Sequence, residues 1–372
     1  MHRNRASSMR CGILISSPIP KDGRGHLMVF IDGDVGRLVV GDSDRLLQQY
    51  PEGMFDLVIT SPPYYRQRSY EAGGIGNEGS VEEYISDLMR IFSQCVRVTK
   101  RTGSIVFNIG DKHDNGDLML VPYRFALAVK EEHPELVLVN DITWVKTNPT
   151  PRQFGRRLVS STEPFFHWAR TKDYHYDRDA FLAGDDEVSE PNPDTRIGSG
   201  YFTQIESSDL TDDQKSLART ELSEAIEKVR RGEATGLRMK IRGVHSEPFG
   251  GQGGGRMIQL ERKGFTIILL HGKRMKRDVI VSPVETVPGS KHPAMFPVGL
   301  VEQVVRLLSP EGGLVLDPFM GSGSTALACL RSKRCYHGVD ISEEYIKEAI
   351  ERIMSWHEGC LQKEIDDNEQ SL

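Results

Sequence analysis

The stretch Leu314-Val-Leu-Asp317-Pro-Phe-Met-Gly321-Ser-Gly323-Ser-Thr325 decides the fold, because it joins an apolar run to a glycine-rich turn and the start of a helix. In open α/β sheets such a turn follows the carboxyl end of a strand, which is where these sheets bind ligands. Glycine has no side chain, so the backbone of the turn can approach a ligand closely. We therefore predict a ligand at this turn, although glycines in many such turns serve packing alone.

A second strand candidate, at residues 335–340, ends in Asp340. A carboxylate at the tip of the second strand is placed to accept hydrogen bonds from the two hydroxyl groups of a ribose. The turn lacks the G-x-G-x-x-G spacing of dinucleotide folds and the G-K-[ST] of a P-loop, which favours neither NAD nor ATP. The pairing of the turn with Asp340 predicts another ligand that contains a nucleoside.

Strand and helix candidates alternate on both sides of an irregular middle. Apolar runs predict strands at 37–42, 55–60, 103–110, 136–145, 313–317 and 335–340. Helical spacing predicts helices at 82–98, 123–132, 296–308, 321–330 and 342–356. From about 148 to 278 the alternation weakens, and a polar helix candidate at 211–231 precedes a glycine-rich loop at 249–255. This order predicts the α/β class, with a doubly wound sheet that an inserted module interrupts.

The tetrapeptide Ser61-Pro62-Pro63-Tyr64 directly follows the strand candidate at 55–60. Two consecutive prolines restrict φ and remove two backbone donors, so the loop is extended and stiff. Ser61 Oγ and the Pro62 carbonyl can each accept one hydrogen of a planar amino group, and Tyr64 can stack on the ring that carries it. Both hydrogen bonds turn the nitrogen lone pair out of conjugation. We predict these four residues as the catalytic group, whose task is positioning and electrostatics. The alternative for the tetrapeptide alone is a plain turn.

Five cysteines are scattered along the 372 residues, at positions 11, 95, 329, 335 and 360, and none lies in the tetrapeptide. This weighs against attack on a ring carbon by a thiolate. Their odd number, without a C-x-x-C pair, predicts a reducing compartment and no zinc site. The apolar run at 11–15 is too short for a signal sequence or a membrane span. We therefore predict a cytoplasmic protein without a metal or a membrane partner.

Charge is distributed unevenly, although the net charge is only −6. Residues 173–215 hold 12 acidic and 3 basic residues, whereas residues 228–277 hold 13 basic and 3 acidic residues. Such an asymmetry is expected when one face meets a polyanion, and the alternative is two solvated surface stretches that differ by chance. The candidate phosphate contacts are Arg152, Arg156, Arg157, Arg238, Lys240, Arg242, Lys273, Arg274, Lys276 and Arg277.

Two segments resemble the signature motifs of DNA amino-methyltransferases of restriction–modification systems and phages. They are Thr60-Ser-Pro-Pro-Tyr64 and Asp317-Pro-Phe-Met-Gly-Ser-Gly-Ser-Thr325. Their order, with the catalytic motif first, is similar to that of the β subgroup, which has a circularly permuted, Rossmann-like methyltransferase fold. The resemblance covers roughly residues 36–172 and 276–356. It implies methyl transfer from S-adenosylmethionine to the exocyclic amino group of a base flipped out of double-stranded DNA.

Further segments resemble the same subgroup. Gly41-Asp42 is similar to the element that contacts the adenine of the cofactor, and residues 291–297 are similar to the segment that closes over its methionine part. The implied cofactor contacts are Asp42, Thr60, Lys291, His292, Pro293, Phe296, Asp317, Pro318, Phe319, Gly321, Ser322, Gly323, Ser324, Thr325 and Asp340. The family often carries Asp-Pro-Pro-Tyr for adenine N6 and Ser-Pro-Pro-Tyr for cytosine N4. Ser61 therefore favours cytosine N4, and adenine N6 is the alternative.

These segments predict an order of domains. We expect a loose segment at 1–25, a catalytic half at 26–150, a target-recognition insert at 151–277, a cofactor-binding half at 278–358 and a frayed tail at 359–372. Duplex DNA is the expected partner, with a second copy of the chain (a homodimer) and a cognate restriction endonuclease as further candidates. The alternatives are methylation of an RNA base or a protein glutamine amide, and a DNA-binding protein without catalysis. The intact Ser61, Tyr64, Gly321 and Asp340 argue against a loss of catalysis.

Overall fold

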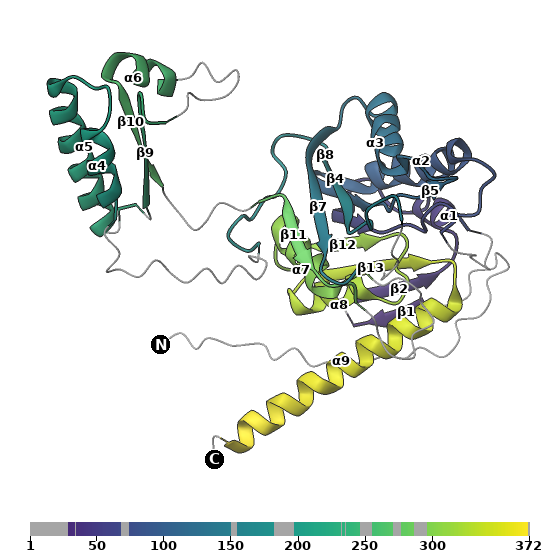
Figure 1. Cartoon of the computed structure of the whole chain (residues 1–372). Helices are drawn as coiled ribbons and strands as arrows, with labels where there is room; N and C mark the ends of the chain where they lie inside the picture. The colour runs from purple at the N-terminus through teal and green to yellow at the C-terminus, as the bar shows by residue number, and fades with distance from the viewer. Residues whose placement is uncertain are drawn as a thin grey trace. The chain divides into compact units, whose positions relative to one another are not determined.

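The computed structural model describes residues 29–33, 35–67, 74–149, 155–181, 197–231, 233–234, 236–245, 255–270, 277–285 and 296–370. The chain divides into two compact units (Figure 1). The first comprises Met1–Asp185 and Lys276–Leu372, and the second comprises Asp186–Met275. The first unit is therefore built from two segments that are far apart in the sequence.

A nine-stranded sheet runs through the first unit in the order β1-β2-β13-β12-β3-β4-β8-β7-β11. Its strands are β1 (Val29–Asp32), β2 (Gly36–Val40), β3 (Phe55–Thr60), β4 (Thr99–Asn108), β7 (Val137–Lys146), β8 (Thr162–Ala169), β11 (Val279–Ser282), β12 (Leu314–Asp317) and β13 (Cys335–Asp340). The strands from β2 to β4 are parallel, and β11 is parallel to β7. β1 is antiparallel to β2, and β8 is antiparallel to both of its neighbours. The predicted doubly wound, permuted sheet is confirmed.

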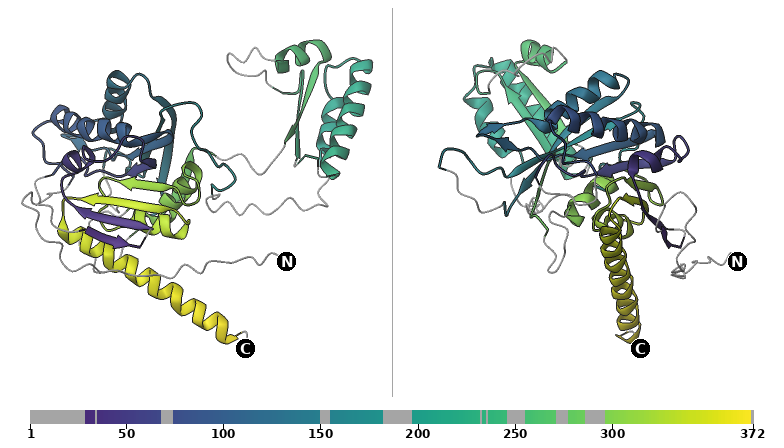
Figure 2. Two further views of the ribbon diagram at one scale, coloured as in Figure 1. Left: turned by 180° about the vertical axis from the view of Figure 1, so that it is seen from behind. Right: turned by 90° about the vertical axis from the view of Figure 1, so that its right-hand side faces the viewer.

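Helices cover both faces of this sheet (Figure 2). They are α1 (Ser43–Leu47), α2 (Val81–Val98), α3 (Val121–Glu132), α7 (Val298–Leu308), α8 (Ser324–Arg331) and α9 (Glu343–Gln370). Leu57 and Ile59 of β3 belong to the core that α7 and α8 complete, whereas Val58 belongs to the core beneath α2 and α3. Burial on both faces explains why this strand is a continuous apolar run. A short hairpin, β5 (His113–Asp114) and β6 (Asp117–Leu118), follows β4.

The second unit has its own small core. Its elements are α4 (Ser199–Glu206), α5 (Asp212–Arg230), β9 (Gly236–Ile241), α6 (Gly255–Lys263) and β10 (Phe265–Leu270), and β9 pairs with β10 in an antiparallel sheet. Met239 and Ile241 of β9 pack with Leu222 and Ile226 of α5. Because side chains alternate along a strand, Arg238 and Lys240 point to the opposite face of this sheet.

The structure differs from the sequence-based predictions at two boundaries. β8 lies in the main sheet although its residues fall in the predicted insert at 151–277, and the second unit begins only at Asp186. The tail predicted to fray from 359 is helical to Gln370, since the stretch contains no proline that would end α9. The predicted loose segment at 1–25 lies outside the described residues, as does the glycine-rich loop at 249–255 except for Gly255, where α6 begins.

Candidate active site

The carboxyl ends of adjacent parallel strands meet at one edge of the main sheet. β13 lies between β2 and β12, and β12 lies between β13 and β3. The register pairs Leu316 with Val58, so Asp317 and Thr60 both lie where their strands end. The glycine-rich turn after β12 and the diproline loop after β3 therefore begin side by side, although more than half of the chain separates them in sequence.

Asp317 links the two motifs directly. Its carboxylate accepts hydrogen bonds from the hydroxyls of Thr60 and Thr325, at 2.5 Å each, and from the backbone N–H of Phe319 at 3.0 Å. Burial raises the pKa of the Asp317 carboxyl to about 6, and these three hydrogen bonds offset part of that effect. Thr60 and Thr325 are buried, with their hydroxyls bound to Asp317, so their contribution to a ligand site is to hold this aspartate.

Glycine is required in the turn itself. Gly321 and Gly323 have φ angles of +52° and +85°, in the left-handed region that L-residues rarely adopt. A Cβ atom on Gly323 would lie 2.8 Å from the Cβ of Ala349 in α9. The turn is thus tightly packed against α9.

Asp340, at the end of β13, orients the same turn. Its Oδ2 accepts the backbone N–H of Gly321, and its Oδ1 accepts the backbone N–H of Ser342, at 2.8 Å each. A carboxylate oxygen has a second lone pair, so both oxygens can still accept a ribose hydroxyl. Burial raises the pKa of the Asp340 carboxyl to about 6. Gly41 donates its N–H to the Asp340 carbonyl at 2.8 Å, which places Gly41 and Asp42 beside the tip of β13.

Arg352 of α9 contacts the glycine-rich turn and was not among the predicted site residues. Its Nη1 donates to the carbonyl of Ser322 at 2.7 Å and to the Ser322 hydroxyl at 3.0 Å. Its Nη2 lies 3.5 Å from Glu285 Oε1. Arginine in a polar helix usually faces solvent, so the sequence carried no signal that this side chain holds the glycine-rich turn.

The diproline loop is held from neighbouring elements. The Tyr84 hydroxyl of α2 donates to the Pro63 carbonyl at 3.0 Å. Gly110, just after β4, packs on the ring of Tyr64, and a Cβ atom there would lie 2.4 Å from a ring carbon. These contacts fix the ring of Tyr64 against the end of the sheet.

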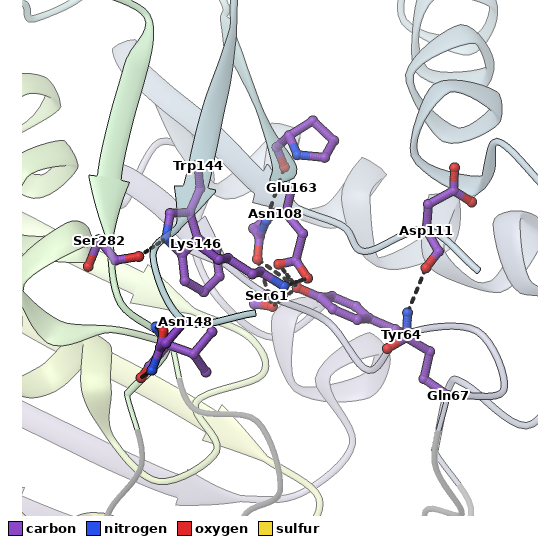
Figure 3. Close-up of polar contacts among 12 residues, drawn as sticks. Ser61, Tyr64, Gln67, Asn108, Asp111, Trp144, Lys146, Asn148, Glu163 and Ser282 are labelled. Atoms are coloured by element: carbon purple, nitrogen blue, oxygen red, sulfur yellow. Dashed lines mark hydrogen bonds and ion pairs between the residues drawn. The ribbon is translucent and has the colours of Figure 1, made fainter. Parts of the chain in front are cut away.

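The hydroxyl of Tyr64 joins a network of polar side chains (Figure 3). It lies 2.7 Å from Asn108 Oδ1, 2.9 Å from Glu163 Oε2 and 3.1 Å from Ser61 Oγ. Lys146 forms an ion pair with Glu163. Burial, and after it the charge of Glu163, raises the pKa of Tyr64 well above its usual value, so its hydroxyl stays protonated. Asn108, Lys146 and Glu163 were not among the predicted site residues.

The polar groups and the glycine backbone at this edge fit a methyl donor that contains a nucleoside. The turn after β12 offers glycine backbone against which a ligand can lie, and Asp340 and Asp42 at neighbouring strand ends offer carboxylates for hydroxyl or amino groups. Ser61 and Pro62 directly follow β3 and so lie beside the start of this turn.

A family model described as DNA methylase, of the N6/N4 type, matches residues 55–351. This range covers both loops, the strands from β3 to β13 and the second unit. The chain belongs to this family of DNA methylases. As a member, the methylase uses S-adenosylmethionine as its methyl donor. The polar groups at the sheet edge fit this cofactor.

Several characterised relatives match most of the methylase. The type II methyltransferase M.SmaI of Serratia marcescens is 26% identical over 348 residues, which cover 86% of this chain and 90% of the relative. M.Cfr9I of Citrobacter freundii, also a type II methyltransferase, is 24% identical over 85% of this chain and 87% of its own. Among solved structures, the PvuII DNA methyltransferase (cytosine-N4-specific) shares the fold, with a TM-score of 0.53, 18% identity and coverage of 85% of each chain.

The remaining predicted site residues lie in several places. Phe296 stacks on Phe165 of β8, with ring centroids 5.5 Å apart. Lys291, His292 and Pro293 lie outside the described residues, as do Arg152, Lys273, Arg274 and Lys276. Arg156, Arg157 and Arg277 are exposed residues of the first unit, whereas Arg238, Lys240 and Arg242 belong to the second. In the described part of the methylase, no helix is long and apolar enough to cross a membrane.

Proposed function

We propose that the methylase transfers a methyl group to N4 of cytosine in double-stranded DNA. The observation that carries this proposal is Ser61, which begins the diproline loop beside the glycine-rich turn. In the family, Ser-Pro-Pro-Tyr often accompanies cytosine N4, and Asp-Pro-Pro-Tyr often accompanies adenine N6. The choice of base thus depends on this residue.

The hydrogen bonds of the loop support amino-group chemistry. Ser61 Oγ lies within 3.3 Å of Asn108 Oδ1 and within 3.1 Å of the Tyr64 hydroxyl, so Ser61 can donate its own proton and still accept one from a substrate amino group. The Pro63 carbonyl is bound by Tyr84, which leaves the Pro62 carbonyl as the second acceptor. Bound S-adenosylmethionine supplies a methyl group on a sulfonium leaving group. The residues of the loop have to hold the amino nitrogen in line with that methyl group.

Two of the described thiols, those of Cys95 and Cys329, are unsuited to attack on a ring carbon. Cys95 of α2 and Cys329 of α8 are buried, and burial raises the pKa of both thiols. Both belong to the apolar cores of the sheet rather than to its carboxyl edge. This supports direct methylation of an amino nitrogen, without a covalent intermediate on the protein.

DNA engagement is assigned to basic side chains of both units. A base inside a duplex cannot reach a pocketed cofactor, so the target base has to be extruded, which costs a few kcal/mol that phosphate contacts can offset. Arg238 and Lys240 share the face of β9 that points away from the core of the second unit. We assign target recognition to this unit, with these residues and Arg156, Arg157 and Arg277 as candidate phosphate contacts. M.SmaI and M.Cfr9I are named type II methyltransferases, which supports a cognate restriction endonuclease as a partner in the cell.

Expression in a host without DNA methylases tests the choice of base. Mass spectrometry of the nucleosides from host DNA should detect N4-methylcytosine, and sequencing of modified bases should place it in one short recognition sequence. DNA from cells that express Tyr64→Ala is the control and should lack the modification. The appearance of N6-methyladenine in place of N4-methylcytosine would show that the proposal is wrong about the base.

A further inference from the structure

A row of polar side chains continues from the diproline loop into the neighbouring strands (Figure 3). Ser61 Oγ donates to the hydroxyl oxygen of Tyr64 at 3.1 Å, and the Tyr64 hydroxyl donates to Glu163 Oε2 at 2.9 Å. Lys146 Nζ pairs with the other carboxylate oxygen, Oε1. One aromatic hydroxyl thus connects Ser61 to a charged carboxylate in β8.

Asn108 helps to set the direction of these hydrogen bonds. Its amide nitrogen donates to the Pro164 carbonyl at 3.0 Å, so its oxygen faces Ser61 and Tyr64 as an acceptor. Tyr64 has one proton to donate, and a charged carboxylate is a stronger acceptor than an amide oxygen. While Glu163 is ionised, the Tyr64 proton therefore points to Glu163, and the Tyr64 oxygen can accept from Ser61.

The ion pair at the end of this row is nearly buried. The side chains of Glu163 and Lys146 are only 12% and 17% exposed, and Lys146 Nζ lies 4.8 Å above the centre of the Trp144 ring. Withdrawing two charges from water costs free energy that their attraction often does not repay. Because such a pair contributes little stability, we consider a functional role for the charge of Glu163 at this edge of the sheet.

Methylation of an amino group leaves a proton to be removed. When the nitrogen lone pair takes up a methyl group, the nitrogen becomes positively charged and still carries two hydrogens. One of these hydrogens has to leave before the neutral product forms. Ser61 is the residue to which we assign a hydrogen bond from this amino group, so the proton has a path that begins at Ser61 Oγ.

We propose that Ser61, Tyr64 and Glu163 form a proton relay for this step, with Lys146 as the counter-ion of Glu163. An N–H bond of the methylated amino group breaks and an O–H bond forms on Ser61. The original Ser61 proton moves to the Tyr64 oxygen, and the original Tyr64 proton moves to Glu163 Oε2. The base loses its positive charge and Glu163 loses its negative charge, so protons and charge balance. Glu163 acts through Tyr64 and is therefore a positioning residue.

This relay rests on the proposed use of Ser61 in amino-group methylation but not on the choice of base, because N4 of cytosine and N6 of adenine lose the same kind of proton. A test that counts methyl groups transferred to DNA is therefore independent of the test for cytosine. If mass spectrometry finds N6-methyladenine, the cytosine proposal is wrong and the relay still stands.

Single-turnover methylation by the full-length protein tests the relay. Labelled S-adenosylmethionine and plasmid DNA from a methylation-deficient host are mixed with excess enzyme over a range of pH. Glu163→Gln keeps the size of the side chain but cannot take up the proton, so we expect its rate constant to fall about a hundredfold, with unchanged affinities for DNA and cofactor. The wild-type rate should fall toward acidic pH more steeply than the rate of Glu163→Gln, which keeps only the fall caused by other carboxyls such as Asp317 and Asp340, with pKa values of about 6.

Glu302 of α7 provides a matched control. Its side chain is also 12% exposed and pairs with an arginine, Arg306, at 2.6 Å, but it lies outside the polar row. Glu302→Gln should keep the wild-type rate and pH profile. Tyr64→Phe keeps the ring and removes the hydroxyl, so it should reproduce the rate and pH profile of Glu163→Gln. The double variant should be no slower than either single variant, because both break the same path.

Two results would overturn the relay. One is a rate for Glu163→Gln close to that of the wild type. The other is a slow Glu163→Gln whose rate falls toward acidic pH as steeply as the wild-type rate does, which would indicate a structural role. If Glu163→Gln does not fold, Tyr64→Phe decides, and a Tyr64→Phe enzyme with the wild-type rate and pH profile would equally overturn the proposal.

Discussion

The glycine-rich turn and the diproline loop lie at the same edge of the sheet, yet they are held in different ways. The turn is held through its own backbone: the Gly321 N–H donates to the Asp340 carboxylate, and Gly323 packs against Ala349 of α9. The diproline loop is held through its own side chains, by the hydrogen bonds of Tyr64 to Asn108 and Glu163. The glycine-rich turn is part of the packed core, whereas the diproline loop is joined to the sheet by hydrogen bonds.

This difference predicts different consequences of mutation. A substitution in the glycine-rich turn has to disturb packing, so stability and cofactor affinity should change together. A substitution in the diproline loop removes hydrogen bonds or ring contacts at the edge of the sheet, so the rate of methyl transfer should change while the fold remains. Three substitutions test this contrast.

Tyr64→Ala should have the largest effect. The variant loses both the ring proposed to stack on the base and the hydroxyl bound to Glu163, so we expect methyl transfer to fall about a thousandfold or more. The variant should still fold, with a lowered thermal unfolding midpoint because a packed ring is lost, and its affinity for S-adenosylmethionine, measured by calorimetry, should stay near that of the wild type. Full activity in this variant would contradict the assignment of the catalytic loop, and loss of the fold would contradict the contrast between the loops.

Gly323→Ala should weaken cofactor binding and stability together. The new Cβ would clash with Ala349 of α9, and the backbone would be strained at its φ of +85°. A strained residue of this kind costs about 1–3 kcal/mol, and we expect cofactor affinity to fall by about tenfold or more. Titration calorimetry and thermal denaturation measure both quantities.

Gly299 of α7 is the matched control, because a Cβ atom there meets nothing within 4 Å. Gly299→Ala lies in a helix and should raise stability by about 0.5–1 kcal/mol without changing cofactor affinity. Equal changes in stability and cofactor affinity for the two substitutions would show that the packing of the turn does not matter for its ligand.

Arg352→Met should have the smallest effect of the three. It removes the hydrogen bonds to Ser322, and hydrogen bonds from charged groups contribute about 1.5–3 kcal/mol in favourable cases. We expect a modest loss of stability and a cofactor affinity lowered by a few-fold. Lys347→Met, on the same helix, removes an exposed ion pair with Glu343 and should change neither quantity. A stability of Arg352→Met equal to that of Lys347→Met would show that the turn does not need this support.

Local sequence patterns predicted the central strands well. The run at 55–60 and the run at 335–340 are β3 and β13, because a strand buried on both faces leaves an unbroken apolar run between polar turns. β8 was missed, although Phe165, Phe166 and Trp168 are among its buried residues. Its apolar run is preceded by Glu163 and Pro164 and interrupted by His167, so the sequence pattern did not predict a buried strand here.

The sequence by itself determined the family, the order of the two motifs and the residues that begin each loop, because these depend on residues adjacent in the chain. The tertiary structure decided which distant side chains support them: Arg352 behind the glycine-rich turn, and Glu163 and Lys146 behind Tyr64. Such contacts depend on strand order and register, which bring together residues far apart in the sequence. A glutamate that appears in the sequence as one of many surface charges becomes, through the pairing of β8 with β4 and β7, a nearly buried partner of Tyr64.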